Sequence, residues 1–252
     1  MSDLADCTVL AGRSVRLTRR NPDAVITALV LPVLLMLVFV YFFGGAIETN
    51  TGKYVTYVAP GVLILCAGYG ASMTATTVSD DMTGGIIDRF RSMDTSPTAV
   101  LSGHVAASVA RNAAATAAVL AVAFAIGFRP HAGPAEWLAA IGILLLYLTA
   151  LSWLGAAAGL LARRTPEAAS GFTFGMLFLP YPSSAFVPID TMPEWLHGFA
   201  DHQPVTPVIE SLRGLLLDQP TGNSPWLALA WCLGLLAVAL PLCAVLFRRR
   251  TG

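Results

Sequence analysis

The sequence predicts an all-α membrane protein with six transmembrane helices. Three observations support this fold class. Of the 252 residues, 56% are hydrophobic and only 12% are charged, whereas soluble domains carry roughly 25% charged residues. Apolar runs of about 20 residues, the length that crosses a bilayer as a helix, recur along the chain. Finally, the arginines and lysines gather on one side of the membrane that these runs define.

The six predicted spans are the apolar runs at 25–43, 59–78, 106–128, 137–162, 168–187 and 226–247. The first run is unlike a cleaved signal peptide, because it is long, lacks an Ala-x-Ala end and is followed by five more spans. Short loops and one longer segment, 188–222, make up most of the remaining chain. We therefore expect residues 1–252 to form a single transmembrane domain, which begins with a short cytoplasmic segment at 1–24.

The distribution of basic residues predicts the orientation. With the N-terminus inside, the other side holds only Lys53, Arg129 and Arg213. The positive-inside rule then places both termini in the cytoplasm, which six spans allow. Arg111 lies within the third span, either as a functional intramembrane charge or, more simply, snorkelling to the inner interface. The basic residues assigned to the cytoplasmic side are Arg13, Arg16, Arg19, Arg20, Arg89, Arg91, Arg163, Arg164, Arg248, Arg249 and Arg250.

Catalytic and metal-binding patterns are absent from the sequence. The four cysteines form no CxxC pair, so neither a disulfide framework nor a zinc site is expected. Neither GxxxxGK[ST] nor GxSxG occurs, which excludes a nucleotide-binding P-loop and a nucleophile elbow. The four histidines are scattered over different loops. The chain is therefore expected to be neither an enzyme nor the holder of a cofactor.

A polar segment at 79–93 separates the second and third spans. Met82, Ile86, Phe90 and Met93 fall at helical spacing, and Gly84-Gly85 permits a sharp bend before most of them. The product is a short helix with an apolar ridge on the cytoplasmic side. Burying this ridge is worth several kcal/mol, at about 25 cal/mol per Å² of apolar surface. The ridge predicts docking of a partner; the alternative is packing on lipid headgroups or on the chain's own bundle.

Residues 4–20 and 188–222 are predicted to form helices outside the spans. Arginines at helical spacing indicate a basic amphipathic helix on the inner leaflet, or else a solvated basic tail. Asn21-Pro22 and Ser96-Pro97 are typical helix starts. In 188–222, Thr191 and Glu194 match a capping box, and a second, amphipathic helix starts near Thr206. Irregular backbone at this depth needs cover by protein or a water cavity, which suggests the exit side of a translocation route or a lid.

Two GxxxG patterns lie in the fourth and fifth spans, at Gly155/Gly159 and Gly171/Gly175. Such patterns permit close approach of helix backbones. Packing within the subunit is the preferred interpretation, because only 163–166 separates the two spans, and a subunit–subunit interface is the alternative.

Several of these segments resemble a known family, the ABC-2 type transporter permeases, and within it the daunorubicin-resistance (DrrB-like) exporter permeases. The similarity covers nearly the whole chain. Its most specific parts are 81–93, 99–101 and 103–105, together with 161–169, 192–196 and 203–207. The chain departs from the usual pattern at 94–97, and at Gln203-Pro204, where many members have Asn-Pro.

The resemblance implies a role for each segment outside the spans. The loop 79–101 would be the coupling helix that docks on an ATP-binding subunit, through Asp81, Met82, Gly84, Gly85, Ile86, Ile87, Asp88, Arg89, Phe90 and Arg91. A connecting helix with Arg13, Arg16 and Arg20 would touch the same subunit. The helices in 188–222 would form an external re-entrant gate with Pro193, Trp195, Pro204, Glu210 and Arg213.

The expected function is then that of the permease subunit of an ATP-binding cassette exporter in the inner or plasma membrane. It would pair with a second permease copy or relative and two ATP-binding subunits, which carry the ATP and Mg²⁺; no partner is a nucleic acid. A hydrophobic drug, antibiotic or lipid-like substrate follows from the resemblance. The rivals are an ATP-independent secondary transporter, which would need more intramembrane ionisable residues, and a structural envelope protein.

Overall fold

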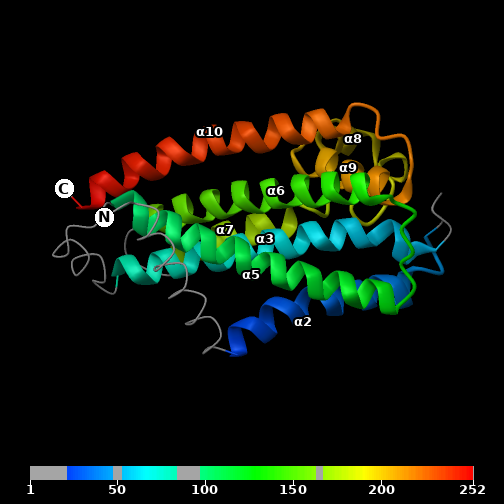
Figure 1. The fold of residues 1–252 in the computed structure, drawn as a ribbon, viewed down its shortest axis with the longest axis horizontal. Helices are drawn as coiled ribbons and strands as arrows, with labels where there is room; N and C mark the ends of the chain where they lie inside the picture. Colours follow the sequence, from blue (N-terminus) through cyan, green and yellow to red (C-terminus); the bar gives the residue numbers. More distant parts are fainter. Residues whose placement is uncertain (1–21, 48–52, 84–96, 163–166, 252) are drawn as a thin grey trace.

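The computed structural model describes residues 22–47, 53–83, 97–162 and 167–251, and these form only helices and connecting turns (Figure 1). The all-α fold is thus confirmed for the described part of the chain. The elements are α2 (Pro22–Val38), the π-helical turn η1 (Phe39–Phe43), α3 (Tyr54–Thr83), α5 (Pro97–Ala125), α6 (Pro134–Leu161), α7 (Glu167–Phe178), the 3-10 turn η2 (Ile189–Thr191), α8 (Glu194–His202), α9 (Val205–Leu217) and α10 (Ser224–Thr251).

Proline begins three of the long helices, at Pro22, Pro97 and Pro134. Proline suits a first helical position because its missing N–H would be unpaired there. The helix starts expected after Asn21 and Ser96 are therefore confirmed, although those two residues lie outside the described ranges. α5 ends at Ala125, two residues before Gly127, whose φ of +111° favours glycine and takes the chain out of the helix.

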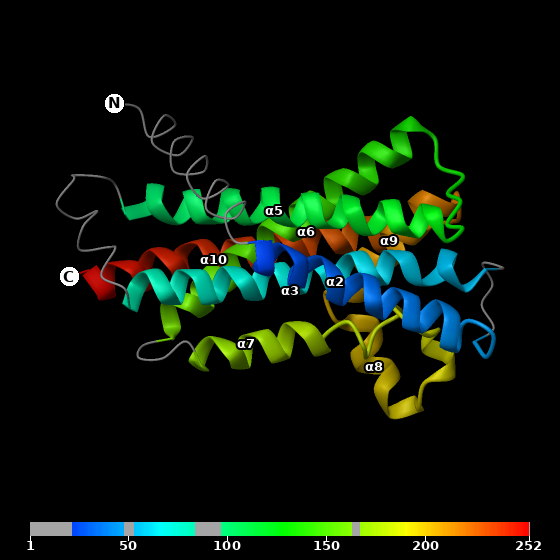
Figure 2. The same ribbon diagram turned by 90° about the horizontal axis from the view of Figure 1, so that it is seen from below.

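α3 lies at the centre of the bundle. It packs against α2, α5, α6 and α7, and it also contacts α9 (Figures 1 and 2). Of an apolar 18-residue stretch of α3, 89% is buried inside the subunit. The same share is only 17% for α10, which packs mainly on α6 and α9. Many apolar side chains of α10, such as Trp226, Leu233 and Val238, are thus left exposed for lipid or another chain. We call the end where α3 ends and α5 begins the Thr83 end, and the opposite end the α9 end.

Within the described residues, four helices are long and apolar enough to cross a membrane: Tyr54–Met82, Leu101–Ala125, Pro134–Leu161 and Ser224–Arg249. A multi-pass membrane protein follows. The six-span count stays a prediction, because Val30–Phe43 is shorter and α7 has 12 residues, about 18 Å of helix against a hydrocarbon core of about 30 Å. The helix predicted over 168–187 ends at Phe178. Turns follow, as Pro180 and Pro182 offer no backbone N–H to continue it.

The two GxxxG patterns have different surroundings. A Cβ at Gly155 or Gly159 would overlap the carbonyl oxygens of Ala71 and Ala75, so α6 lies directly on the backbone of α3. This confirms packing within the subunit for the first pattern. Gly171 and Gly175 on α7 face open space, so an interface with another subunit stays a prediction for the second pattern.

Candidate functional site

The residues singled out from the sequence lie at opposite ends of the bundle. Asp81 and Met82 close α3 at the Thr83 end, whereas the five expected gate residues belong to the α9 end. The rest of the expected coupling segment, from Gly84 to Arg91, and the arginines of the expected connecting helix lie outside the described residues. The structure therefore describes only the start of the expected coupling segment, at Asp81 and Met82, but it describes all five expected gate residues.

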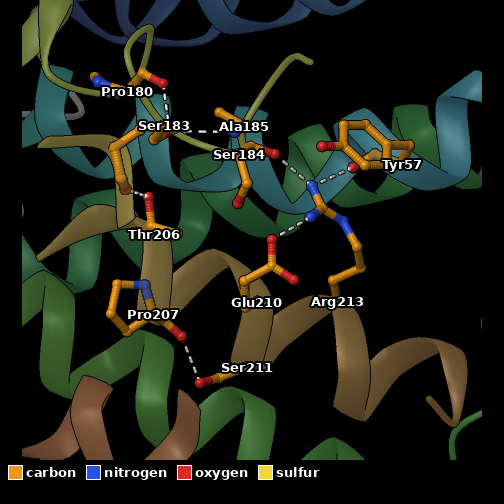
Figure 3. A network of polar contacts seen from close by, with 11 residues as sticks. Tyr57, Pro180, Ser183, Ser184, Ala185, Thr206, Pro207, Glu210, Ser211 and Arg213 are labelled. Atoms are coloured by element: carbon orange, nitrogen blue, oxygen red, sulfur yellow. Dashed lines mark hydrogen bonds and ion pairs between the residues drawn. The ribbon is translucent and has the colours of Figure 1, made fainter. Parts of the chain in front are cut away.

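A network around Arg213 joins three parts of the chain at the α9 end (Figure 3). One guanidinium nitrogen, Nη1, donates to Glu210 Oε1 at 2.7 Å, one turn earlier on α9. The other, Nη2, donates to the carbonyl oxygens of Ser184 at 2.7 Å and Tyr57 at 3.2 Å. The guanidinium also stacks over the Tyr57 ring, 3.8 Å from its centroid. α9 is thereby tied to α3 and to the turn after α7.

This arrangement suits an arginine in particular. The side chain is only 5% exposed, and a buried charge is tolerated only when it is paired and hydrogen-bonded. The planar fork of guanidinium donors reaches three acceptors while its face rests on an aromatic ring, which an ammonium group cannot do. Glu210 faces the solvent more openly, with 39% of its side chain exposed.

The turn after α7 is held by further hydrogen bonds. The Ser183 hydroxyl donates to the Pro180 carbonyl at 2.5 Å and accepts from the Ala185 N–H at 3.1 Å. The Tyr54 hydroxyl donates to the Phe186 carbonyl at 2.6 Å. Gly61 allows the turn to lie against α3, since a Cβ there would come within 2.5 Å of the Ala185 carbonyl oxygen. These contacts hold the turn in place against the α9 end of α3.

The five expected gate residues do not form one cluster. Glu210 and Arg213 are in direct contact, but Pro193 precedes the first turn of α8, and Trp195 on that helix is 80% exposed. Pro204 lies at the junction of α8 and α9. The expected capping box is wrong: the Thr191 hydroxyl donates to the Pro188 carbonyl at 2.6 Å, and α8 begins only after Pro193.

Three other residues of the site escaped sequence reasoning. The backbone carbonyls of Tyr57 and Ser184 accept hydrogen bonds from Arg213. Because every residue type has the same backbone carbonyl, the sequence does not show such a contact. Gln203 donates its side-chain amide to the Pro182 carbonyl, which ties the α8–α9 junction to the turn. The sequence offered one signal, that Gln203 stands where many family members have Asn, but this did not indicate which group its side chain would bind.

At the Thr83 end, a side-chain contact between a histidine and an aspartate joins the two helices that flank 84–96. His104 Nε2 on α5 lies 3.0 Å from Asp81 Oδ2 on α3, which makes Nε2 the N–H donor. An apolar cluster that includes Val78, Leu101 and Val105 lies behind the pair. The two helices from which the expected coupling loop extends are therefore held together at this end.

Between the two ends, hydroxyl and amide groups connect α3, α5 and α6. Ser108 on α5 contacts Thr74 on α3 and lies 3.1 Å from the hydroxyl of Ser152 on α6, and Asn112 donates to it at 3.5 Å. These groups are uncharged, and Arg111 beside them is half-buried with no ion pair among the described residues. Within the described ranges, no group of three or more His, Cys, Asp or Glu side chains could hold a metal.

Hydroxyl groups also bond to the backbone of α3 itself. Ser72 donates to Gly68 and Thr74 to Gly70, each at 3.0 Å. Thr76 and Thr77 donate to the carbonyl of Met73 at 3.0 and 2.7 Å. Each such bond competes with the helix's own hydrogen bonds and tends to bend the helix.

The bundle of long apolar helices, with buried uncharged polar groups between them, defines a multi-pass membrane protein. The sequence model described as "ABC-2 type transporter" matches residues 5–217, and the chain belongs to that family. Members of this family are transmembrane subunits, and a separate subunit hydrolyses the ATP.

Two curated relatives match over most of their lengths. The daunorubicin resistance ABC transporter permease protein DrrB1 of Streptomyces coeruleorubidus is 29% identical over 241 residues, which cover 95% of this chain and 85% of the relative. The probable doxorubicin resistance ABC transporter permease protein DrrC of Mycobacterium tuberculosis is 24% identical over 234 residues, covering 91% and 83%.

Proposed function

We propose that the chain is the permease subunit of an ATP-binding cassette exporter and forms the path for a hydrophobic drug, antibiotic or lipid-like substrate. The observation that carries the proposal is the family match from residue 5 to residue 217, which includes both the loop at 79–101 and the network around Arg213. The relatives are named for resistance to daunorubicin and doxorubicin, so an amphiphilic polycyclic drug is the first substrate class to test.

The ATP-binding subunit docks, in this proposal, on the loop 79–101. Ile86, Ile87 and Phe90 supply the apolar contact, and Asp88, Arg89 and Arg91 its charged rim. The pair between Asp81 and His104 supports the proposal, because it ties both roots of the loop together and a push on the loop then moves α3 and α5 as one.

The α9 end forms the external gate. Arg213 ties α9 to α3 and to the turn after α7, so these parts move as one body when the path opens. Pro193, Trp195 and Pro204 lie on or beside α8, which makes fewer attachments. Both termini are cytoplasmic in this proposal, and two permease subunits assemble with two ATP-binding subunits.

The test is co-expression of the chain with a candidate ATP-binding subunit and purification of both in nanodiscs. Phe90→Asp is expected to abolish copurification and the ATPase rate that the permease stimulates, because it puts a charge into the apolar contact. Asn223→Asp, an exposed position at the α9 end, is the matched control and should change neither. Unaltered copurification and ATPase rate with Phe90→Asp would refute the coupling assignment, and daunorubicin export in the same system tests the substrate class.

A further inference from the structure

Arg111 is a cation in the middle of the bundle without a partner in the described part of the chain. It is the middle residue of α5, about 21 Å from either end of the helix at 1.5 Å per residue. Its side chain is half-buried, and among the described residues it has neither a hydrogen bond nor an ion pair. Arginines near helix ends reach the interface, but an ionisable residue deep in a span indicates a functional site.

The neighbouring surface of α3 carries polar side chains and is open. Tyr69 and Thr77 lie on one ridge of α3 with Asp81, at multiples of four residues, and both are at least partly exposed. Asp81 contacts His104 on α5, which lies two turns before Arg111 on the same face of that helix. The ridge and Arg111 therefore border the same side of the pair formed by α3 and α5.

Tyr69 lies at nearly the same depth as Arg111. The two helices run antiparallel, and a Cβ at Gly70 would overlap the side chain of Asn112. Tyr69 and Arg111, each one residue earlier on its helix, are thus within one turn of each other in depth. Figures 1 and 2 show α2 extending from about the middle of the bundle to the α9 end, so α2 does not cover the Thr83 half of this side.

We propose that Arg111 and Tyr69 form a binding site for an anionic oxygen group of the transported substrate, such as a carboxylate, a sulfonate or a phosphate. The guanidinium offers parallel N–H donors to such a group, and the phenol offers one O–H. The site rests on the proposed transport function. It narrows the substrate class to amphiphiles that carry a negative charge as well as an apolar body.

An acidic side chain of a second copy explains the site less well. α5 and α10 contain no Asp or Glu, and those of α3 lie in its last turn, at Asp80 and Asp81. The acidic residues of α6 and α7 lie in the first turn of each helix, at Glu136 and Glu167. A second copy therefore brings no carboxylate from these helices to mid-membrane. A lipid phosphate stays in the headgroup region, about 15 Å from the middle of the hydrocarbon core.

Photolabelling of the purified chain in phosphatidylcholine nanodiscs tests the site. The probes are three amphiphiles with the same diazirine-bearing alkyl chain and a sulfonate, an alcohol or a trimethylammonium headgroup. Peptide mass spectrometry measures the label on α3 and α5 as each probe is titrated. Arg111→Gln and Tyr69→Phe remove the two donors. Arg129→Gln is the matched control, because this arginine lies beyond the α9 end of α5 and donates to backbone carbonyls there.

The sulfonate should half-saturate labelling at a concentration at least about tenfold lower than the alcohol, because hydrogen bonds between charged groups are the stronger ones. The trimethylammonium probe should show no saturable labelling. Arg111→Gln should abolish the preference for the sulfonate, Tyr69→Phe should weaken sulfonate labelling about two- to tenfold, and Arg129→Gln should change neither. Equal labelling by the sulfonate and the alcohol, or an unchanged preference in Arg111→Gln, would overturn the proposal. Displacement of the sulfonate by phosphatidylglycerol would also overturn it, because a bilayer lipid would then be the occupant.

Two further measurements separate this site from the fold and from the transport function. Arg111→Leu should raise the unfolding midpoint in the absence of probe, because it removes an unpaired charge from the membrane interior. A lower midpoint would show that Arg111 serves the fold and would overturn the proposal. With an ATP-binding subunit present, selective labelling without ATP-driven export of the sulfonate would refute the proposed function but not the site. Export without a headgroup preference in labelling would refute the site but not the function.

Discussion

Arg213→Met removes the cation that joins α9, α3 and the turn after α7 while keeping a long apolar side chain. The change deletes the hydrogen bonds to the Ser184 and Tyr57 carbonyls, the bond to Glu210 and the stack on the Tyr57 ring. Glu210 can turn to water, because its side chain is 39% exposed. The two carbonyl oxygens are buried and are left without this donor.

The expected loss of stability is large for a single substitution. Leaving two buried carbonyl oxygens without this donor costs about 1–3 kcal/mol each, and each kcal/mol corresponds to roughly 2–4 °C in the unfolding midpoint of a protein of this size. Arg213→Lys keeps the charge but cannot bridge three acceptors or stack on the ring, so it should lose most of the same stability. Glu210→Gln should cost no more than about 1 kcal/mol, because the carboxylate is partly solvated.

The assay is thermal unfolding of the purified chain in detergent and in nanodiscs, followed by size-exclusion recovery at a fixed heating rate. The order Arg213→Met, then Arg213→Lys, then Glu210→Gln in decreasing destabilisation supports the reasoning. If Glu210→Gln lowers the midpoint as much as Arg213→Met, the ion pair rather than the two carbonyls stabilises the α9 end. If Arg213→Met lowers it by less than about 2 °C, the network contributes little.

Three further predictions use the same unfolding assay. Gly159→Leu should severely destabilise the chain, because the new side chain would overlap the α3 backbone. Gly171→Leu should not, because position 171 faces open space. Equal effects of the two changes would contradict the packing of α6 on α3. Ser108→Ala should cost about 1 kcal/mol, in the range of interhelical hydrogen bonds in membranes, and no loss would mean that the hydroxyl cluster is not formed. His104→Leu should lower the free energy of unfolding by at most about 1 kcal/mol. His104→Lys should lower it less, because lysine can still pair with Asp81. An equal loss with both variants would show that charge pairing with Asp81 does not contribute to stability.

The bundle itself was predictable because its signals are local. The length of each apolar run, the prolines at helix starts and the positions of the arginines are all properties of short stretches of chain. The fifth predicted span shows the limit of this reasoning. Its composition stays apolar up to Val187, but Pro180 and Pro182 turn an apolar stretch into irregular backbone that only the rest of the protein can cover.

The candidate site was only partly predictable for a different reason. Glu210 and Arg213 could be named from the resemblance, and their spacing on a helix brings them together. What makes Arg213 stable is the Tyr57 carbonyl, 156 positions away in the sequence, and the carbonyl of a turn. Main-chain acceptors look alike in every sequence, so such contacts follow only from the folded arrangement. The same holds for the glycines, where the pattern at Gly155 and the pattern at Gly171 read alike but have different neighbours.

The hydroxyl groups that bond back to the α3 backbone between Gly68 and Thr77 have a mechanical consequence. They favour bending in the middle of the helix, while Arg213 holds the α9 end of α3 at Tyr57 and Asp81 joins the Thr83 end to α5. α3 is therefore held in place at both ends, and its middle is the part that bends most readily. We therefore expect a force applied at the Thr83 end to bend α3 in its middle before it moves the α9 end.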